Sequence, residues 1–162
     1  MRIELNDSAI CDEILALTAL RNSGRRDNGE ETALLTRDFL PGLRNMVRMM
    51  FAETVVELHG YVRECGLDDA DPSPNLPYGG ESCMRLMVEL TTGAEPQSGM
   101  SLAIKRTLEH LVAVKVLEAI AGPGDMEFAD TLGAQRLAAL GSLRNTLDSM
   151  ESIPSAVTGY RF

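Results

Sequence analysis

Histidine is the first side chain to examine for chemistry, because imidazole serves in acid–base catalysis and as a metal ligand near neutral pH. The chain contains two histidines, His59 and His110. Neither belongs to a spaced metal motif, and the sequence assigns no nucleophile or orienting group to either of them. We therefore interpret both as exposed or simply hydrogen-bonded histidines.

A second set of chemical groups lies between Asp69 and Asn75, where oxygen-bearing side chains occupy alternate positions, as they do in a calcium-binding loop. A helix-loop-helix calcium site needs glycine at its sixth position and glutamate at its twelfth. Those positions hold Pro74 and Gly80 here. The segment is therefore predicted to be a solvated, proline-rich loop without a metal ion.

The remaining candidates for catalysis lack the spacing that their chemistry needs. Ser82 is not part of a GxSxG turn, and the chain has neither a P-loop nor a GxGxxG motif. Asp12 and Glu13 are adjacent, so on a helix they point to different sides and do not form a catalytic pair. We predict a protein that is not an enzyme and that uses no cofactor.

Composition narrows the functional class further. The 162 residues suit one domain, and a net charge of −9 repels the phosphate backbone of nucleic acids. Three cysteines without CxxC spacing indicate reduced thiols. The N-terminus has no signal-peptide core, and the longest nearly apolar tract, 111–121, is too short to span a bilayer. We expect a cytoplasmic protein that binds neither nucleic acid nor membrane.

The elements that would position these groups are mostly helical. The segment from about Met100 to Ala121 is apolar nearly all round, interrupted in its last turns only by Lys115 and Glu118. Such a helix must be wrapped by other elements, which predicts a central helix with Val112, Val116 and Ile120 in the core.

Other segments of the chain are predicted to surround this helix. A strand is expected at Arg2–Leu5, followed by a shorter helix that Asp7 or Ser8 caps and that ends in the polar loop 22–31. A long helix should start near Thr36 or Pro41 and continue to Cys65 and Gly66.

The second half of the chain adds a strand and a helix. Alternation from Met84 to Leu90 predicts a half-buried strand that pairs with the first one. A last helix should follow Asp125, antiparallel to the central one, with Gly133 and Gly141 allowing close packing. Its expected apolar stripe comprises Phe128, Leu132, Leu137, Leu140, Leu143, Leu147 and Met150.

The predicted fold is therefore mainly α: a small helical bundle around a central helix, with a minor two-stranded antiparallel β element. We assign residues 1–152 to a single helical domain and 153–162 to a flexible C-terminal tail.

Methionine-rich segments are typical of adaptable cores, but they also occur on binding surfaces. Met49 lies off the helical stripe that carries Met46 and Met50, so an exposed Met49 beside Phe51 would suit a contact between subunits. The tail adds two aromatic groups. The candidate interface residues are Met49, Phe51, Tyr160 and Phe162.

The segment Asp12–Gly24, DEILALTALRNSG, resembles the opening of a loosely defined family of short, uncharacterised proteins encoded in bacterial prophages. The order of elements along most of the chain is similar as well. The resemblance implies a virion assembly component, comparable to head-tail connector or completion proteins, with ring or subunit contacts and no active site. It provides no catalytic residues to carry over.

The expected function is thus that of a non-enzymatic structural or assembly protein of phage or prophage origin. Its partners would be further copies of itself, forming a homo-oligomer, or other virion proteins, in the cytoplasm or in the virion. The alternative is a small intracellular adaptor or regulator that binds a host protein or peptide. Oligomeric state separates the two, because a ring component self-associates whereas an adaptor need not.

Overall fold

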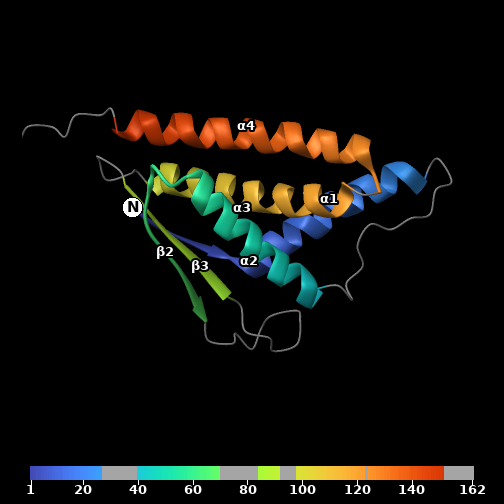
Figure 1. Cartoon of the computed structure of the whole chain (residues 1–162), viewed down its shortest axis with the longest axis horizontal. Coiled ribbons are helices and arrows are strands. Elements are labelled where there is room, and N and C mark those ends of the chain that lie inside the picture. The colour runs from blue at the N-terminus through green and yellow to red at the C-terminus, as the bar shows by residue number, and fades with distance from the viewer. Residues whose placement is uncertain (27–39, 70–83, 92–97, 123, 152–162) are drawn as a thin grey trace, which may run out of the picture.

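The computed structural model describes residues 1–26, 40–69, 84–91, 98–122 and 124–151. These residues form a mainly helical structure in which the helices pack against one another and against a small antiparallel sheet (Figure 1). In chain order the elements are β1 (Arg2–Asn6), α1 (Asp7–Arg26), α2 (Leu40–Glu57), β2 (Val62–Asp69), β3 (Met84–Leu90), α3 (Ser98–Ala121) and α4 (Met126–Glu151). The prediction of a mainly α fold is confirmed.

Helix α3 is the centre of the structure, as its composition predicts. Helices α1, α2 and α4 and strand β1 all contact it. Every side chain from Leu111 to Leu117 is buried, including Val112 and Val116, while Ile120 is partly buried. Burial on all sides requires a helix that is apolar nearly all round, and α3 meets this requirement.

Helix α4 lies beside α3 and runs in the opposite direction, as predicted (Figure 1). Asp125 caps it, since its Oδ1 atom accepts a hydrogen bond from the Phe128 amide at 3.3 Å. The expected stripe is buried except at two positions: Phe128 is partly buried and Leu137 is exposed. The assignment of Leu137 to the stripe is wrong, because at 3.6 residues per turn it lies about 100° around the helix from the buried leucines.

The sheet has the strand order β1-β3-β2, with β3 antiparallel to both neighbours. Ile3 pairs with Val88 and Leu5 with Leu86, so the predicted pairing of the first strand with Met84–Leu90 is confirmed. The sheet has three strands rather than the two expected. The alternating buried side chains of the two predicted strands are Ile3, Leu5, Leu86, Val88 and Leu90.

The unexpected strand is β2, and its residues 62–66 are those predicted to continue the second helix. Helix α2 ends at Glu57, and the chain turns with the Tyr61 amide donating to the Leu58 carbonyl at 2.8 Å. The expected helix through Cys65 and Gly66 is wrong because these residues hydrogen-bond with β3, far away in the sequence. Helical periodicity before Gly60 cannot reveal such a pairing.

The boundaries of α1 also differ from the prediction. Its first turn is capped by Asn6, whose Oδ1 accepts from the Ser8 amide at 2.9 Å, one or two residues before the cap that we expected at Asp7 or Ser8. Helix α1 continues to Arg26 and is no shorter than α2. Near this end Arg21 Nε donates to Asp125 Oδ2 at 2.7 Å, a contact that holds the last turns of α1 against the start of α4.

Candidate functional site

The predicted interface residues have different positions in the structure. Met49 is 61% exposed, as expected. Phe51 is buried and belongs to the core, so its assignment to an interface is wrong; it shares the inward face of α2 with Val47 and Thr54. Tyr160 and Phe162, together with the rest of the tail, lie outside the described residues.

Helix α2 presents a second large apolar side chain on the side that carries Met49. Val56 is 69% exposed and follows Met49 by two helical turns, and the exposed Ala52 lies between them. We name these three residues the α2 ridge. Spacing alone could have indicated Val56, because residues i and i+7 lie on the same side of a helix.

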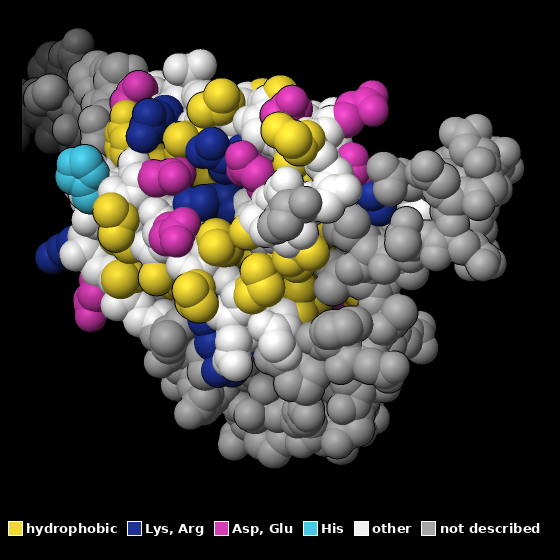
Figure 2. All heavy atoms as spheres, turned by 45° about the vertical axis from the view of Figure 1, so that its right-hand side comes forward, with side chains coloured by type: hydrophobic (Ala, Val, Ile, Leu, Met, Phe, Trp, Pro, Cys, Tyr) yellow, Lys and Arg dark blue, Asp and Glu magenta, His cyan; other side chains and the backbone are white. Residues whose placement is uncertain are grey.

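Beside the α2 ridge lies a cluster of charges contributed by three helices. Lys115 of α3 is 6% exposed, and its Nζ atom lies 3.0 Å from Glu57 Oε1 and 3.5 Å from Glu53 Oε2 of α2. Glu118 of α3 binds Arg136 of α4, with Arg136 Nε donating to Glu118 Oε2 at 2.8 Å. Figure 2 shows hydrophobic side chains bordering this cluster of alternating basic and acidic groups.

The charged side chains line an open groove between α2 and α4, which we name the ion-pair groove. Its lining residues are Met50, Glu53, Glu57, Lys115, Glu118, Ala119 and Arg136. One end is closed, because Arg144 donates to the Glu57 backbone carbonyl at 2.9 Å and Tyr61 donates to Asp148 Oδ1 at 2.5 Å. Toward the N-terminal end of α2 the two helices diverge (Figure 1).

The electrostatics of this groove are asymmetric. Two carboxylates share the single Lys115 ammonium group, and both are more exposed than it is: the Glu57 side chain is 32% exposed and the Glu53 side chain 58%. Glu57 Oε2 is buried and has no hydrogen-bond partner among the described residues. Glu53 is therefore the carboxylate that the groove presents most fully to an incoming molecule, whereas Lys115 is covered and Arg136 is 25% exposed.

His110 is the histidine with the more distinctive surroundings. Its Nδ1 atom lies 2.6 Å from Glu13 Oε1, across the contact between α3 and α1. A carboxylate that orients an imidazole is also part of hydrolase triads, but no hydrogen bond joins His110 to a hydroxyl group within the described ranges. The nearby Thr107 hydroxyl donates to the Ala103 carbonyl at 3.0 Å. The pair therefore holds α1 and α3 together.

His59 and Glu109 are two other titratable groups with defined surroundings. His59 is exposed at the end of α2, with Nδ1 3.1 Å from the Val56 carbonyl, as the simpler interpretation predicts. Glu109, next to His110, is buried, and burial raises the pKa of its carboxyl group above the usual 4.5. Lys105 and Arg106 oppose this effect, and Glu13 adds to it.

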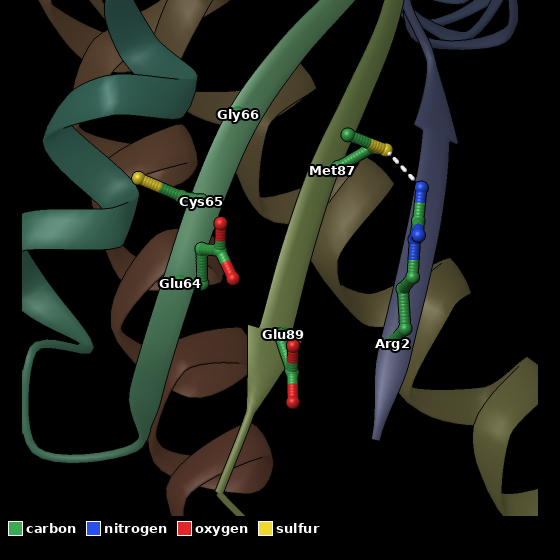
Figure 3. Close-up of a pocket in the computed structure, with 6 residues that line it drawn as sticks. All are labelled: Arg2, Glu64, Cys65, Gly66, Met87 and Glu89. Carbon is green, nitrogen blue, oxygen red and sulfur yellow. Dashed lines mark hydrogen bonds between the residues drawn. The ribbon is translucent and has the colours of Figure 1, made fainter.

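The outer face of the sheet carries a shallow hollow lined by Arg2, Glu64, Cys65, Gly66, Met87 and Glu89. Arg2 donates to the Met87 sulfur at 2.6 Å, and Figure 3 shows the Cys65 thiol turned away from these two side chains. The polar groups therefore do not converge on one point, which a catalytic or ligand site requires.

No group of three His, Cys, Asp or Glu side chains in the described part of the chain could hold a metal ion. The predicted loop Asp69–Asn75 lies outside it beyond Asp69, which ends β2. No described helix is both long enough and apolar enough to cross a membrane. Cys11 is buried and Cys65 exposed, and neither of them forms a disulfide bond.

A scan against protein-family models, a search of curated proteins and a search of solved structures each found no match to this chain. The segment Asp12–Gly24 that resembles the prophage-encoded proteins lies within α1. The resemblance is therefore an expectation from the sequence.

Proposed function

We propose that this protein is a non-enzymatic structural or assembly protein that acts through contacts with other protein subunits. The observation that carries the proposal is the α2 ridge, where Met49 and Val56 are both mostly exposed on one side of a helix whose opposite side is core. A partner that covers aligned apolar side chains removes apolar area from water, and this burial stabilises the complex.

The surroundings of the ridge support a protein partner rather than a small molecule. The ion-pair groove is open and runs along a helix, whereas small-molecule sites are concave and enclose most of their ligand. Interfaces combine a few apolar contacts with a polar, hydrated rim. The α2 ridge and the charges of Glu53 and Glu57 have this arrangement.

A phage or prophage origin is supported by the resemblance of Asp12–Gly24 and by the similar order of elements expected from the sequence. On this proposal the protein is a virion assembly component that acts in the cytoplasm or the virion. The position of its gene tests this part: capsid, portal or tail genes beside it would support a virion role, and a chromosomal neighbourhood without phage genes would contradict it.

The alternative is an adaptor that binds a host protein or peptide. The acidic groups beside the α2 ridge favour this alternative, because they suit a partner that differs from this chain. Both functions use the same surface and differ in the identity of the partner.

Co-expression with the proteins encoded beside it tests the proposal. We expect one of them to co-purify with the wild type and to be lost from a Met49→Ser, Val56→Ser double variant. A Leu20→Ser, Met126→Ser variant is the matched control, because Leu20 and Met126 are both exposed elsewhere on the molecule. Equal retention by both variants would contradict a role for the α2 ridge.

A further inference from the structure

We propose that the α2 ridge and the ion-pair groove bind an amphipathic helix of a different protein, one whose apolar stripe is flanked by lysine and arginine. The inference rests on the proposed function and names the kind of subunit that this surface contacts. It follows from three features: the spacing of the apolar side chains, the distribution of charge, and the poor fit of a second copy of this chain.

The apolar spacing suits a helix. Met49 and Val56 are seven residues apart, which is about 10 Å along the axis of α2, or two turns. A partner helix repeats its own apolar side chains at the same interval, so the two stripes can interdigitate. Ala52 between them is small and exposed, so the backbones can approach closely at the centre of the contact.

The groove gives the partner room on one side of the ridge. Helix α2 meets α4 near Glu57 and diverges from it toward its N-terminal end (Figure 1). Ala119 of α3 is exposed in the space between them, and Met50 adds a partly buried apolar wall. A helix lying against the α2 ridge would thus have one flank over the charges of the groove.

Charge determines which residues that flank should carry. Glu53, Glu57 and Glu118 provide three negative charges, and Lys115 and Arg136 provide two positive ones, which leaves one excess negative charge in the groove. The ammonium group of Lys115 is almost fully covered, whereas the Glu53 carboxylate is the most exposed charge of the set. The whole chain carries a net charge of −9, so both the near and the distant field attract a basic segment.

A second copy of this chain fits less well. In an antiparallel, two-fold symmetric packing of α2 centred on Ala52, the same flank of each helix meets its counterpart. The two copies of Glu53 would then approach each other, since Glu53 is adjacent to the centre. Like charges placed opposite each other disfavour such a contact, and each copy also brings a net charge of −9.

A synthetic helix tests the inference directly. The probe is a fluorescein-labelled peptide of about 18 residues, long enough for five turns, with leucine at the i, i+3 and i+7 positions and lysine on both flanks. One control peptide keeps the leucine stripe and replaces every lysine by glutamate. A second control has the probe's composition in an order without a stripe. Fluorescence anisotropy with the full-length protein gives the Kd of each.

We expect the probe to bind and both control peptides to bind at least about tenfold more weakly. Met49→Ser, Val56→Ser should weaken probe binding by about tenfold or more, because a few central apolar residues dominate interface energies. Leu20→Ser, Met126→Ser should leave it unchanged, since these equally exposed residues lie elsewhere. Circular dichroism checks that each variant keeps the wild-type helix content.

A second pair of variants separates the groove from general attraction between an acidic protein and a basic peptide. Glu53→Gln should weaken binding about two- to fivefold, whereas Glu64→Gln, which removes an exposed charge on the sheet, should have no effect beyond that of net charge. Equal effects of the two changes would overturn the inference. A Kd above about 1 mM for the probe, or binding that both serine double variants weaken equally, would overturn it as well.

The outcomes also separate this inference from the proposed function. Light scattering over a concentration series should give the same mass for the wild type and for the Met49→Ser, Val56→Ser variant, because the ridge is not a contact between copies of this chain. A mass that rises with concentration in the wild type, but not in the Met49→Ser, Val56→Ser variant, would mean that a second copy occupies the ridge. That result would refute the basic-helix partner and leave the assembly function standing. Probe binding at the ridge, with no binding to any virion protein, would support the basic-helix partner and refute the assembly function.

Discussion

Arg21 and Lys115 are two buried cations whose carboxylate partners differ in exposure. Arg21 and Asp125 are both 7% exposed, and the Arg21 guanidinium lies 5.1 Å from the centre of the Phe128 ring. Lys115 is buried to the same degree, but its partners Glu53 and Glu57 are partly exposed. The first pair is closed inside the structure, and the second is open on its carboxylate side.

The difference indicates two roles for buried charge. Arg21 and Asp125 join α1 to the start of α4, because Arg21 Nε and Nη2 both donate to Asp125 Oδ2 where water is excluded, although the buried Nη1 atom has no partner among the described residues. Lys115 instead holds two carboxylates of α2 at the surface of α3, where they remain accessible. A closed pair fixes elements relative to each other, whereas an open cluster also presents charge to a partner.

The largest expected effect comes from a buried charge without a partner. Val116 is fully buried and follows Lys115 on α3. Val116→Asp should abolish the cooperative thermal transition, because an unpaired buried charge costs several kcal/mol of a total stability of about 5–15 kcal/mol. Val116→Ala is the control and should unfold cooperatively at a lower temperature. A Val116→Asp protein with a sharp transition near that of the wild type would show that the centre of α3 is not core.

The next largest loss of stability is expected at the closed pair of Arg21 and Asp125. Asp125→Ala is expected to lower the free energy of unfolding by about 3–5 kcal/mol, because it leaves the Arg21 charge buried and also removes the cap of α4. Asp125→Asn retains an oxygen for the cap and isolates the loss of charge. Urea denaturation measures both, with the exposed Asp130→Ala as control. Equal stability of Asp125→Ala and Asp130→Ala would contradict a structural role for the pair.

Glu109 tests a buried carboxyl group whose pKa is raised by burial. Between 4.5 and this raised pKa the folded protein holds a proton that the unfolded chain has lost, so stability falls as pH rises through that interval. Glu109→Gln cannot titrate and should be more stable than the wild type at pH 7, with a smaller difference at pH 4. Urea denaturation at both pH values measures this. A variant that is less stable at pH 7 would show that the ion pairs with Lys105 and Arg106 outweigh burial.

The smallest effect on stability is expected at the open cluster. Glu53→Gln should change the free energy of unfolding by less than about 0.5 kcal/mol, because Glu53 is mostly exposed and Lys115 keeps Glu57 as its nearer partner. Thermal unfolding measures the change. A loss comparable to that of Asp125→Ala would mean that the open cluster is as structural as the closed pair.

Much of the fold could be predicted from local pattern. The nearly apolar α3 and the alternation in β3 specify their own environments, and the cap at Asp125 is visible in the sequence. Strand β2 could not be predicted, because helical spacing continues up to Leu58 and the strand is specified by hydrogen bonds with β3. Such pairing is a tertiary property.

The candidate site shows the same division. Met49 could be identified because it departs from the buried stripe of α2, and Val56 follows from the same spacing. Phe51 was misassigned because an aromatic residue next to an exposed one can belong to either side of a helix. The partners of Lys115 could not be predicted, since Glu57 is 58 residues away and only the packing of α2 on α3 brings them together.

The measurement that tests the central claim most directly is a map of backbone amide chemical shifts while the lysine-flanked probe is added to the isotope-labelled protein. We expect the changes to concentrate on residues 49–57 of α2, on 115–119 of α3 and near Arg136 of α4. The amides of Arg21 and Asp125 should change little, because that pair is closed. Changes spread evenly over the surface, or largest on the outer face of the sheet, would contradict the assignment of the α2 ridge and the ion-pair groove as the protein-binding surface.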